Sequence, residues 1–284
     1  MIKKMTKINY TSLQENLIIN QHYENFPIAR FLSRELRHAV ATVYAFARIG
    51  DDLADEGSSS KTHRQALLQQ MKSQLERIKT DGHPNISLFQ DLQKIIRQFN
   101  LDTQYFDDLL DAFLQDTMKK SYVNEKELDT YYQKAAHSAG RIYLQINRLA
   151  QPMNKQYSDC ICNAFAMLDM LQDIPEDFKK NRVYLPITLQ KKFKLMLAHD
   201  QFEQFNQNWQ AFKHYWTKKI EQKLLHGTGI IHTPSIRFNL QMRVLVATGL
   251  HLNQKLKKSK NPFKNNRMTF IDWGVVLIKG MMIK

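Results

Sequence analysis

The apolar residues of this chain recur with the spacing of α-helices over almost its whole length. They return at intervals of three and four, which places them on one face of a helix with 3.6 residues per turn. Segment 61–80 shows this pattern clearly. Its apolar side holds Leu67, Leu68, Met71, Leu75 and Ile78. The pattern predicts further amphipathic helices over 86–99, 103–120, 125–150 and 189–226, the last interrupted near 198–200.

Three segments are apolar almost all round and are therefore expected to form buried helices. They cover residues 36–50, 158–174 and 235–254, and a short terminal helix is expected at the end of the chain. The sequence has no notable strand pattern and no internal repeat, and its linkers are short. We therefore expect an all-α fold and interpret residues 1–284 as one domain with a core of about 20–280.

The composition narrows the class of protein further. Glycine accounts for only 9 of the 284 residues, whereas β-rich and dinucleotide-binding folds use glycine for turns and phosphate loops. An apolar fraction of 43% is enough for a packed core and excludes an intrinsically disordered chain. We interpret Cys160 and Cys162 as reduced core thiols of a cytoplasmic protein. The sequence shows no secretory signal and no apolar run long enough to span a membrane.

The charge of the chain is strongly positive, with 41 Lys and Arg against 27 Asp and Glu and a formal net charge of +14. This excess admits three classes of partner: nucleic acid, an anionic membrane surface or an anionic substrate. The sequence has no nucleic-acid-binding signature, so we expect no nucleic-acid partner. It also lacks the G-x-S-x-G, P-loop and G-x-G-x-x-G motifs, which gives no support to a hydrolase or a nucleotide enzyme.

Two of the apolar helices end in clusters of carboxylates. Asp51 and Asp55 lie four residues apart, and Asp169, Asp173 and Asp177 repeat at the same interval. Residues at this spacing are neighbours on one helix face, where like charges repel unless a cation lies between them. Carboxylate oxygens suit hard cations such as Mg²⁺, which typically binds one or two carboxylates together with substrate phosphate. The alternative for either cluster alone is an acidic helix end in solvent.

A third acidic run has the letters DDxxD but sits on an amphipathic helix. Its carboxylates belong to Asp107, Asp108 and Asp111, which alternate with apolar neighbours. We interpret them as a mostly solvent-facing side of that helix rather than a metal site. The role of Asp116, further along the same helix, stays open.

Several longer motifs resemble those of the squalene/phytoene synthase family. The runs HYENFP at 22–27 and YAFARIGDDLADE at 44–56 resemble its first aspartate motif. The runs DIPED at 173–177 and RVYLP at 182–186 resemble its second, D-x-x-E-D followed by R-x-Y-L-P. The resemblance extends from about residue 20 to the tail, where Trp273 follows an aspartate. Within the family, E-N-F-P and D-E-G look most similar to the bacterial hydroxysqualene synthases of hopanoid pathways.

The resemblance implies an all-α isoprenoid synthase fold, in which helices surround a central apolar cavity, and it implies Mg²⁺ as cofactor. Five aspartates match metal-binding positions: Asp51, Asp55, Asp169, Asp173 and Asp177. Four residues match positions that would hold the substrate diphosphate: Arg48, Arg182, His22 and Phe26. Three tyrosines match catalytic positions near the reacting groups: Tyr44, Tyr131 and Tyr184.

The resemblance also implies a reaction. Presqualene diphosphate would ionise, the resulting cation would rearrange, and water would capture it to give hydroxysqualene without a reductant. The first alternative is head-to-head coupling of two farnesyl diphosphates to presqualene diphosphate, squalene or a phytoene-like product. The second alternative is an inactive interaction module that keeps the fold. The expected partners are the isoprenoid diphosphate and other enzymes of the hopanoid pathway.

The expected location is the cytoplasm, with a peripheral contact at the inner face of the membrane. The basic segment 255–267 holds six Lys and Arg residues and no acidic residue. Such a segment is attracted to anionic lipid, although a solvated loop is the alternative.

The sequence departs from the family pattern at five positions near the motifs. Aspartate stands at 169 and alanine at 166, where many relatives carry Asn and Gln. Asn181 replaces the usual Gly of G-R-x-Y-L-P, and His137 occupies a position that is often Asn. Pro175 lies inside the second motif and removes a helical N–H, so a bend is expected there. These departures bear on the exact step rather than on family membership.

Overall fold

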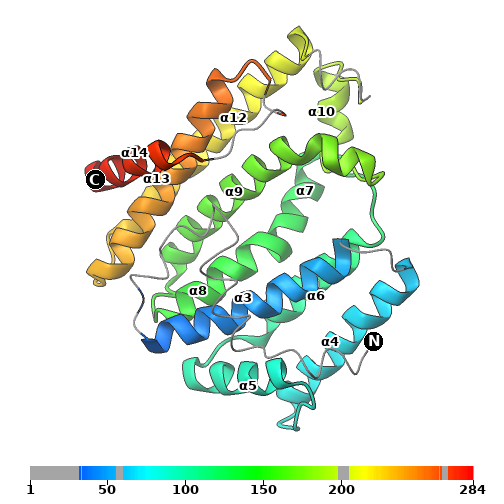
Figure 1. The fold of residues 1–284 in the computed structure, drawn as a ribbon, viewed down its shortest axis with the longest axis vertical. Coiled ribbons are helices and arrows are strands. Elements are labelled where there is room, and N and C mark those ends of the chain that lie inside the picture. Colours follow the sequence, from blue (N-terminus) through cyan, green and yellow to red (C-terminus); the bar gives the residue numbers. More distant parts are fainter. Residues whose placement is uncertain are drawn as a thin grey trace. The chain divides into compact units, whose positions relative to one another are not determined.

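The computed structural model describes residues 32, 34–55, 60–197, 205–261, 263 and 268–283 (Figure 1). Its helices are α3 (Arg34–Asp55), α4 (Lys61–Lys79), α5 (Ser87–Phe99), α6 (Thr103–Asp116), α7 (Glu125–Tyr132), the π-helix η2 (Gln133–His137), α8 (Ser138–Ile146), α9 (Pro152–Lys179), α10 (Ile187–Lys192), α12 (Gln207–Gly227), the 3₁₀-helix η3 (Thr228–Ile231), α13 (Ile236–Lys258) and α14 (Phe270–Met282). The described residues contain no strand, only one isolated parallel bridge between Ser121 and Val183. The predicted all-α fold is confirmed.

The chain divides into two compact units. The first unit comprises residues 1–118 and 141–150, and the second comprises 119–140 and 151–284. The interpretation of residues 1–284 as one domain stays a prediction.

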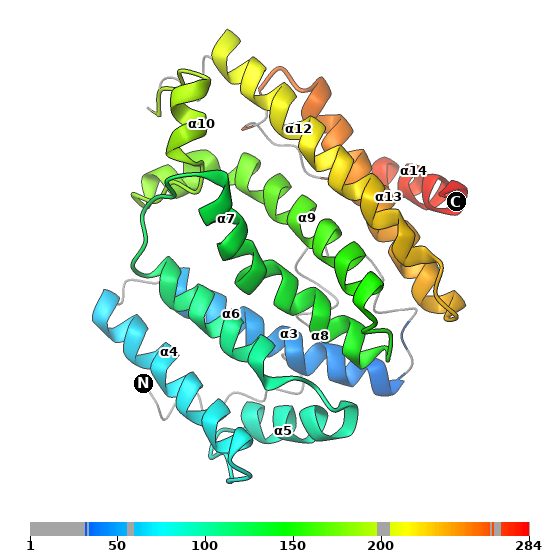
Figure 2. The ribbon, with the colours of Figure 1, turned by 180° about the vertical axis from the view of Figure 1, so that it is seen from behind.

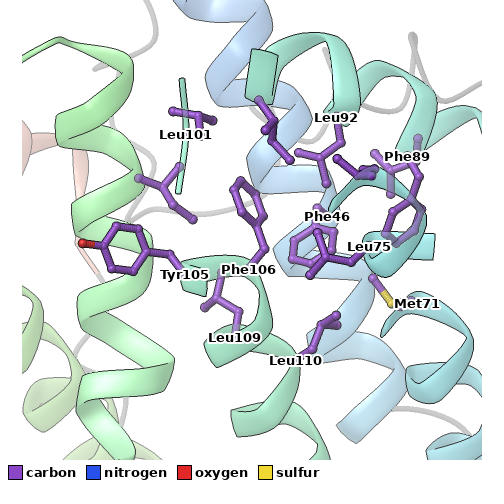
Figure 3. Packing of buried hydrophobic residues seen from close by; sticks show 14 of the residues in the cluster. Phe46, Met71, Leu75, Phe89, Leu92, Leu101, Tyr105, Phe106, Leu109 and Leu110 are labelled. Atoms are coloured by element: carbon purple, nitrogen blue, oxygen red, sulfur yellow. The ribbon is translucent and has the colours of Figure 1, made fainter. Parts of the chain in front are cut away.

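The first unit is built from α3 to α6 and most of α8, with α3 packed against α4, α5 and α6. Its core centres on Phe46 of α3, which is fully buried. The Phe46 ring meets Phe89 of α5 and Phe106 of α6 edge to face, at centroid distances of 5.8 and 5.4 Å (Figure 3). Such pairs add to the stabilisation from burial alone. The apolar stripe predicted from the sequence on 61–80 contributes Leu68, Met71, Leu75 and Ile78 to this core.

The second unit is built around α9, which packs mainly against α12, while α13 lies against α12 and α9 (Figures 1 and 2). Trp209, Phe212 and Trp216 of α12 are fully buried in its core. The indole Nε1 of Trp216 donates a hydrogen bond to the Met167 carbonyl of α9 at 3.0 Å, so this buried polar group is satisfied.

The observed helices follow most of the predicted ones closely, and many differences concern their ends. The predicted helix over 189–226 is an exception, because α10 ends at Lys192 and residues 193–197 are not helical. Helix α3 continues through Asp55, and α9 continues through Pro175 to Lys179. The predicted helix over 125–150 contains the π-helical turn η2 between α7 and α8. Cys160 and Cys162 lie on α9 as thiols, half-buried rather than fully in the core. Among the described helices, none combines the length and apolar character needed to cross a bilayer.

Candidate functional site

The first acidic cluster lies on the last turns of α3, in the first unit. Arg48 reaches both following aspartates: its Nη2 lies 2.7 Å from Asp52 Oδ1, and its Nη1 lies 3.6 Å from Asp51 Oδ2. The side chain of Asp51 is 50% exposed. Since Asp51 and Asp55 are four residues apart on this helix, they share one face and remain accessible to a ligand from solvent.

Two close contacts fix the end of α3 in place. A Cβ on Gly50 would lie 2.6 Å from the ring of Phe113, so only glycine lets α3 approach α6 this closely. Arg64 Nη1 of α4 donates a hydrogen bond to the Ala54 carbonyl at 3.0 Å, which satisfies one of the last carbonyls of the helix. Both contacts flank the carboxylates, so the packing of α3 sets where they point.

The DDxxD run on α6 is engaged in other contacts. Asp107 forms an ion pair with Lys79 of α4, and Asp111 forms one with Lys72 of the same helix. Asp108 accepts a hydrogen bond from Gln104 at 2.9 Å. These carboxylates are half-buried beside α4 rather than simply solvated. Lysines therefore neutralise two of the three acidic groups, which supports the interpretation that this run is not a metal site.

The second acidic cluster lies on α9, in the second unit. The helix runs without interruption through Pro175, whose missing N–H leaves the Leu171 carbonyl without its intrahelical donor. Asp169 is half-buried, Asp173 is exposed, and Asp177 is buried. Three carboxylates at identical spacing thus have three different environments, which sequence periodicity alone does not indicate.

Asp177 is paired with Arg182. The carboxylate oxygen Oδ1 accepts hydrogen bonds from Arg182 Nη2 at 2.9 Å and from Nε at 3.2 Å, and both side chains are about nine-tenths buried. The backbone N–H of Arg182 also donates to the Asp177 carbonyl at 2.9 Å. The chain folds back this tightly because Asn181 adopts φ 55°, the left-handed conformation that glycine adopts most readily and asparagine tolerates best among the other residues.

A cluster of tyrosines lies beside this ion pair. The guanidinium of Arg182 sits over the ring of Tyr184 at 4.9 Å. The rings of Tyr184 and Tyr131 lie 5.4 Å apart, so two of the three predicted tyrosines meet. Tyr122, which the sequence did not single out, packs against both, at 5.7 Å from Tyr184 and 5.6 Å from Tyr131. Lys119 Nζ lies 4.3 Å from the Tyr122 ring.

Long-range backbone contacts bring Tyr122 to this cluster. The N–H of Val183 donates to the Lys120 carbonyl at 2.8 Å, and the N–H of Ile187 donates to the Tyr122 carbonyl at 2.9 Å. The two segments are about sixty residues apart in sequence, and no local spacing relates them. The R-x-Y-L-P run is therefore held alongside the segment before α7, which explains why sequence patterning missed Tyr122.

A small pocket opens beside the ion pair, with room for about one water molecule. Its polar lining comes from Asp177 and Arg182, and its apolar lining includes Tyr184, Met170 and Ile174. The central apolar cavity expected from the sequence stays a prediction.

The remaining predicted site residues stand as follows. Tyr44 is half-buried on α3. His22 and Phe26 lie outside the described residues. The first unit thus brings Arg48, Asp51 and Asp55 to one helix end, and the second brings Asp177, Arg182 and the tyrosines together.

The donor set is suited to a hard cation. Within the described ranges, no group of three or more His, Cys, Asp or Glu side chains is arranged to hold a metal ion by itself. All five predicted ligands are carboxylates, and Mg²⁺ commonly takes only one or two carboxylates and completes its shell with substrate phosphate and water. The residues present therefore fit Mg²⁺ bound together with a diphosphate.

The π-helix η2 marks a further departure from a regular fold. His137, its last residue, is buried against α9, where its Nε2 lies 2.8 Å from Asn163 Oδ1. Its Nδ1 lies 3.5 Å from Asp159 Oδ2. Both ring nitrogens thus face polar groups of α9, and His137 acts in packing between η2 and α9. Single π-turns of this kind occur often near functional sites.

This arrangement of helices is the squalene synthase fold. The solved structure of a squalene synthase from Alicyclobacillus acidocaldarius matches 90% of this chain and 97% of its own, with a TM-score of 0.77 and 24% identity. Residues 19–273 match the squalene/phytoene synthase family, and the chain belongs to that family.

Two relatives with assigned activities have sequences similar to this chain. The chain is 33% identical over 192 residues to a hydroxysqualene synthase of Zymomonas mobilis, covering 65% of this chain and 61% of that protein. It is 30% identical over 164 residues to a presqualene diphosphate synthase of Rhodopseudomonas palustris, covering 57% of this chain and 58% of that protein. The matches span about three fifths of these relatives.

Proposed function

We propose that this protein converts presqualene diphosphate and water into hydroxysqualene, diphosphate and a proton, in a Mg²⁺-dependent reaction. The observation that carries the proposal is the 33% identity to a hydroxysqualene synthase, in a chain that keeps both aspartate clusters of the family. Under this proposal the enzyme works in the cytoplasm alongside other enzymes of hopanoid synthesis.

Under this proposal, the five predicted aspartates and two arginines bind the diphosphate and its metal ion. Asp51, Asp55, Asp169, Asp173 and Asp177 would hold Mg²⁺. Bound Mg²⁺ would neutralise the diphosphate and stabilise it as a leaving group. Arg48 and Arg182 would donate to phosphate oxygens, since a planar guanidinium binds two oxygens of an oxyanion at once.

The Asp177–Arg182 pair has a consequence for this role. Both groups are nearly buried and bound to each other, so neither can contact substrate fully while the pair stays closed. Entry of a diphosphate would let Arg182 exchange one anionic partner for another. Asp177 would at the same time become available to a cation. The pair therefore keeps both charges compensated until substrate arrives, which avoids the cost of a buried uncompensated charge.

The tyrosine cluster suits the carbocation part of the reaction. Loss of diphosphate breaks a C–O bond and leaves a positive charge on carbon, and the cyclopropane bonds then rearrange. Aromatic faces stabilise a nearby cation. Tyr131, Tyr184 and Tyr122 would supply such faces beside the departing diphosphate, and Tyr44 would act from α3. The captured water forms the new C–O bond and loses a proton.

Labelled water tests the proposal directly. Purified protein is incubated with presqualene diphosphate and Mg²⁺ in ¹⁸O-water without NADPH, and the product is analysed by mass spectrometry. We expect an alcohol that carries one labelled oxygen. A hydrocarbon product, or an alcohol without the label, contradicts the proposal.

The principal alternative is formation of presqualene diphosphate from two farnesyl diphosphates. Its support is the 30% identity to a presqualene diphosphate synthase. Incubation with farnesyl diphosphate alone separates the two activities, because only the alternative consumes it. A protein that fails to bind diphosphate in the presence of Mg²⁺ would instead be an inactive module with the same fold.

A further inference from the structure

Helix α14 has one face that packs in the second unit and one face that does not. Helix α14 lies against α13 (Figures 1 and 2). Val276 is fully buried, and a Cβ on Gly280 would meet the Val244 backbone of α13 at 3.4 Å. The opposite face is apolar and open. Its residues Leu277, Ile278, Met281 and Met282 are 38%, 54%, 66% and 71% exposed. These four residues, which we call the outer stripe, follow the i, i+4 spacing of one helix face.

The charges around the outer stripe are positive. The sequence has no acidic residue after Asp272, while Lys279 lies within the stripe's own helix. Lys258 and Lys260 are exposed at the end of α13, near the start of α14.

The one aspartate of α14 is already neutralised. The Asp272 carboxylate accepts hydrogen bonds from Lys255 at 2.7 Å, from His251 at 2.8 Å and from the Thr269 N–H at 2.7 Å. These contacts hold the start of α14 against α13. They also compensate the negative charge of Asp272, so it contributes little to the potential at the surface. The apolar stripe therefore shares its helix with one cation, Lys279, whose Nζ donates a hydrogen bond to the neutral Gln254 Oε1 at 3.2 Å. Lys258 and Lys260 lie exposed at the end of α13, toward the start of the same helix.

We propose that the outer stripe of α14 docks on an anionic lipid bilayer, with Lys258, Lys260 and Lys279 at the level of the headgroups. A helix of 13 residues is about 20 Å long, too short to cross the ~30 Å hydrocarbon core. An apolar face bordered by lysines is instead typical of a helix that lies in the interface plane. The chemistry of the surface thus points to lipid as the partner.

A second copy of the chain fits this surface less well. A two-fold contact between outer stripes would place Lys279 and the neighbouring lysines of both copies close together. Like charges at an interface repel, whereas anionic headgroups attract them.

The membrane contact proposed here lies on α14, whereas the sequence predicted it in the basic segment 255–267. Two lysines of the basic segment 255–267 are occupied, because Lys255 pairs with Asp272 and Lys257 pairs with Glu221. The apolar residues that anchor the surface lie on α14 instead. The lysines that remain exposed at the end of α13 then act as an electrostatic border rather than as the anchor.

Vesicle binding tests this proposal, and the fluorescence of Trp273 reports whether α14 is the helix that contacts the lipid. The chain has three tryptophans, of which Trp209 and Trp216 are buried and only Trp273, on α14, is half-buried. Full-length protein is mixed with vesicles of phosphatidylcholine, with or without phosphatidylglycerol, whose acyl chains carry bromine. We expect salt-sensitive sedimentation with the anionic vesicles and bromine quenching that disappears in Trp273→Phe.

Two sets of variants separate the apolar and electrostatic contributions. Ile278→Gln/Met281→Gln should lose most binding, while Ile236→Gln/Met153→Gln, at equally exposed apolar positions elsewhere, should bind as wild type. Lys258→Gln/Lys260→Gln/Lys279→Gln should weaken binding by roughly fivefold for each lysine near the surface. The matched triple Lys61→Gln/Lys126→Gln/Lys194→Gln should have a much smaller effect.

The result that overturns the proposal is also specific. Equal vesicle binding by the stripe variant and wild type, with both proteins folded by circular dichroism, removes lipid as the partner of α14. A wild-type dimer that becomes a monomer in the stripe variant, without any vesicle binding, assigns the face to a second copy instead. Neither measurement depends on turnover, so the proposed reaction can fail while this inference stands.

Discussion

Arg182 holds Asp177 through two hydrogen bonds to a single carboxylate oxygen, and both side chains are nearly buried. Asp177 was expected to bind the metal ion and Arg182 the diphosphate, yet in this structure the two side chains bind each other. Breaking a buried pair by removing one charge leaves the other without compensation, which typically costs about 3 kcal/mol or more. Asp177 thus contributes to stability as well as to the proposed chemistry.

Comparison of Asp177→Asn with Asp173→Asn separates these two contributions. Asp177→Asn should lower the free energy of unfolding by about 3 kcal/mol and abolish turnover. Asp173→Asn removes a carboxylate that is exposed at the same helix end, so it should abolish turnover with a change in stability within about 0.5 kcal/mol. Urea unfolding and product formation are measured for both. Equal stability of the two variants would contradict a structural role for the ion pair.

The two acidic runs of the first unit should behave differently on mutation. Asp51→Asn should abolish turnover at saturating Mg²⁺ while the helical circular dichroism signal stays unchanged. Asp108→Asn should retain near-wild-type turnover, because Asp108 lies on α6 and accepts a hydrogen bond from Gln104. A wild-type rate for Asp51→Asn would show that the first motif does not hold the metal.

The turn at Asn181 gives a prediction about backbone conformation. Asn181→Gly places the least strained residue at φ 55° and should change stability by less than about 1 kcal/mol. Asn181→Val puts a β-branched residue into the left-handed region and should destabilise by about 1–2 kcal/mol. Arg182 follows directly, so the Val variant should also lose activity. Identical urea midpoints for the two variants would mean that the turn relaxes without strain.

The sequence predicted the helices well because each of them is encoded by local periodicity. It also located both aspartate clusters, since their spacing is local. The pairing of Asp177 with Arg182 was not predicted, because it depends on the positive φ of Asn181 between them. The place of Tyr122 was missed because it rests on contacts with residues about sixty positions away. Local patterning thus predicts most of the helices, while the turn and the long-range pairing bring Asp177, Arg182 and the tyrosines together.

A substitution at Gly50 tests whether the close packing of α3 against α6 positions the first aspartate motif. Gly50→Ala would place a Cβ 2.6 Å from the Phe113 ring, so α3 and α6 must move apart. We expect destabilisation of about 1–3 kcal/mol, as for other overpacked core positions, and reduced turnover because Asp51 moves with the helix. Gly274→Ala on α14 is the matched control, since no atom lies within 4 Å of its Cβ. Alanine should stabilise that helix by up to about 1 kcal/mol.

The contact between Asp272 and His251 predicts how α14 responds to acid. Burial alone would raise the pKa of Asp272, but hydrogen bonds from Lys255, His251 and Thr269 hold this pKa well below its ordinary value. A carboxylate with a depressed folded-state pKa contributes stability that is fully present above its unfolded-state pKa of about 4 and is lost as the pH falls through the lower folded value. The stability difference between wild type and Asp272→Asn should therefore stay constant from neutral pH to about pH 4 and shrink only below it. Urea unfolding at several pH values, followed by tryptophan fluorescence, measures this difference. A difference that already declines between pH 7 and pH 5 would contradict the assignment of this pH dependence to the Asp272 carboxylate.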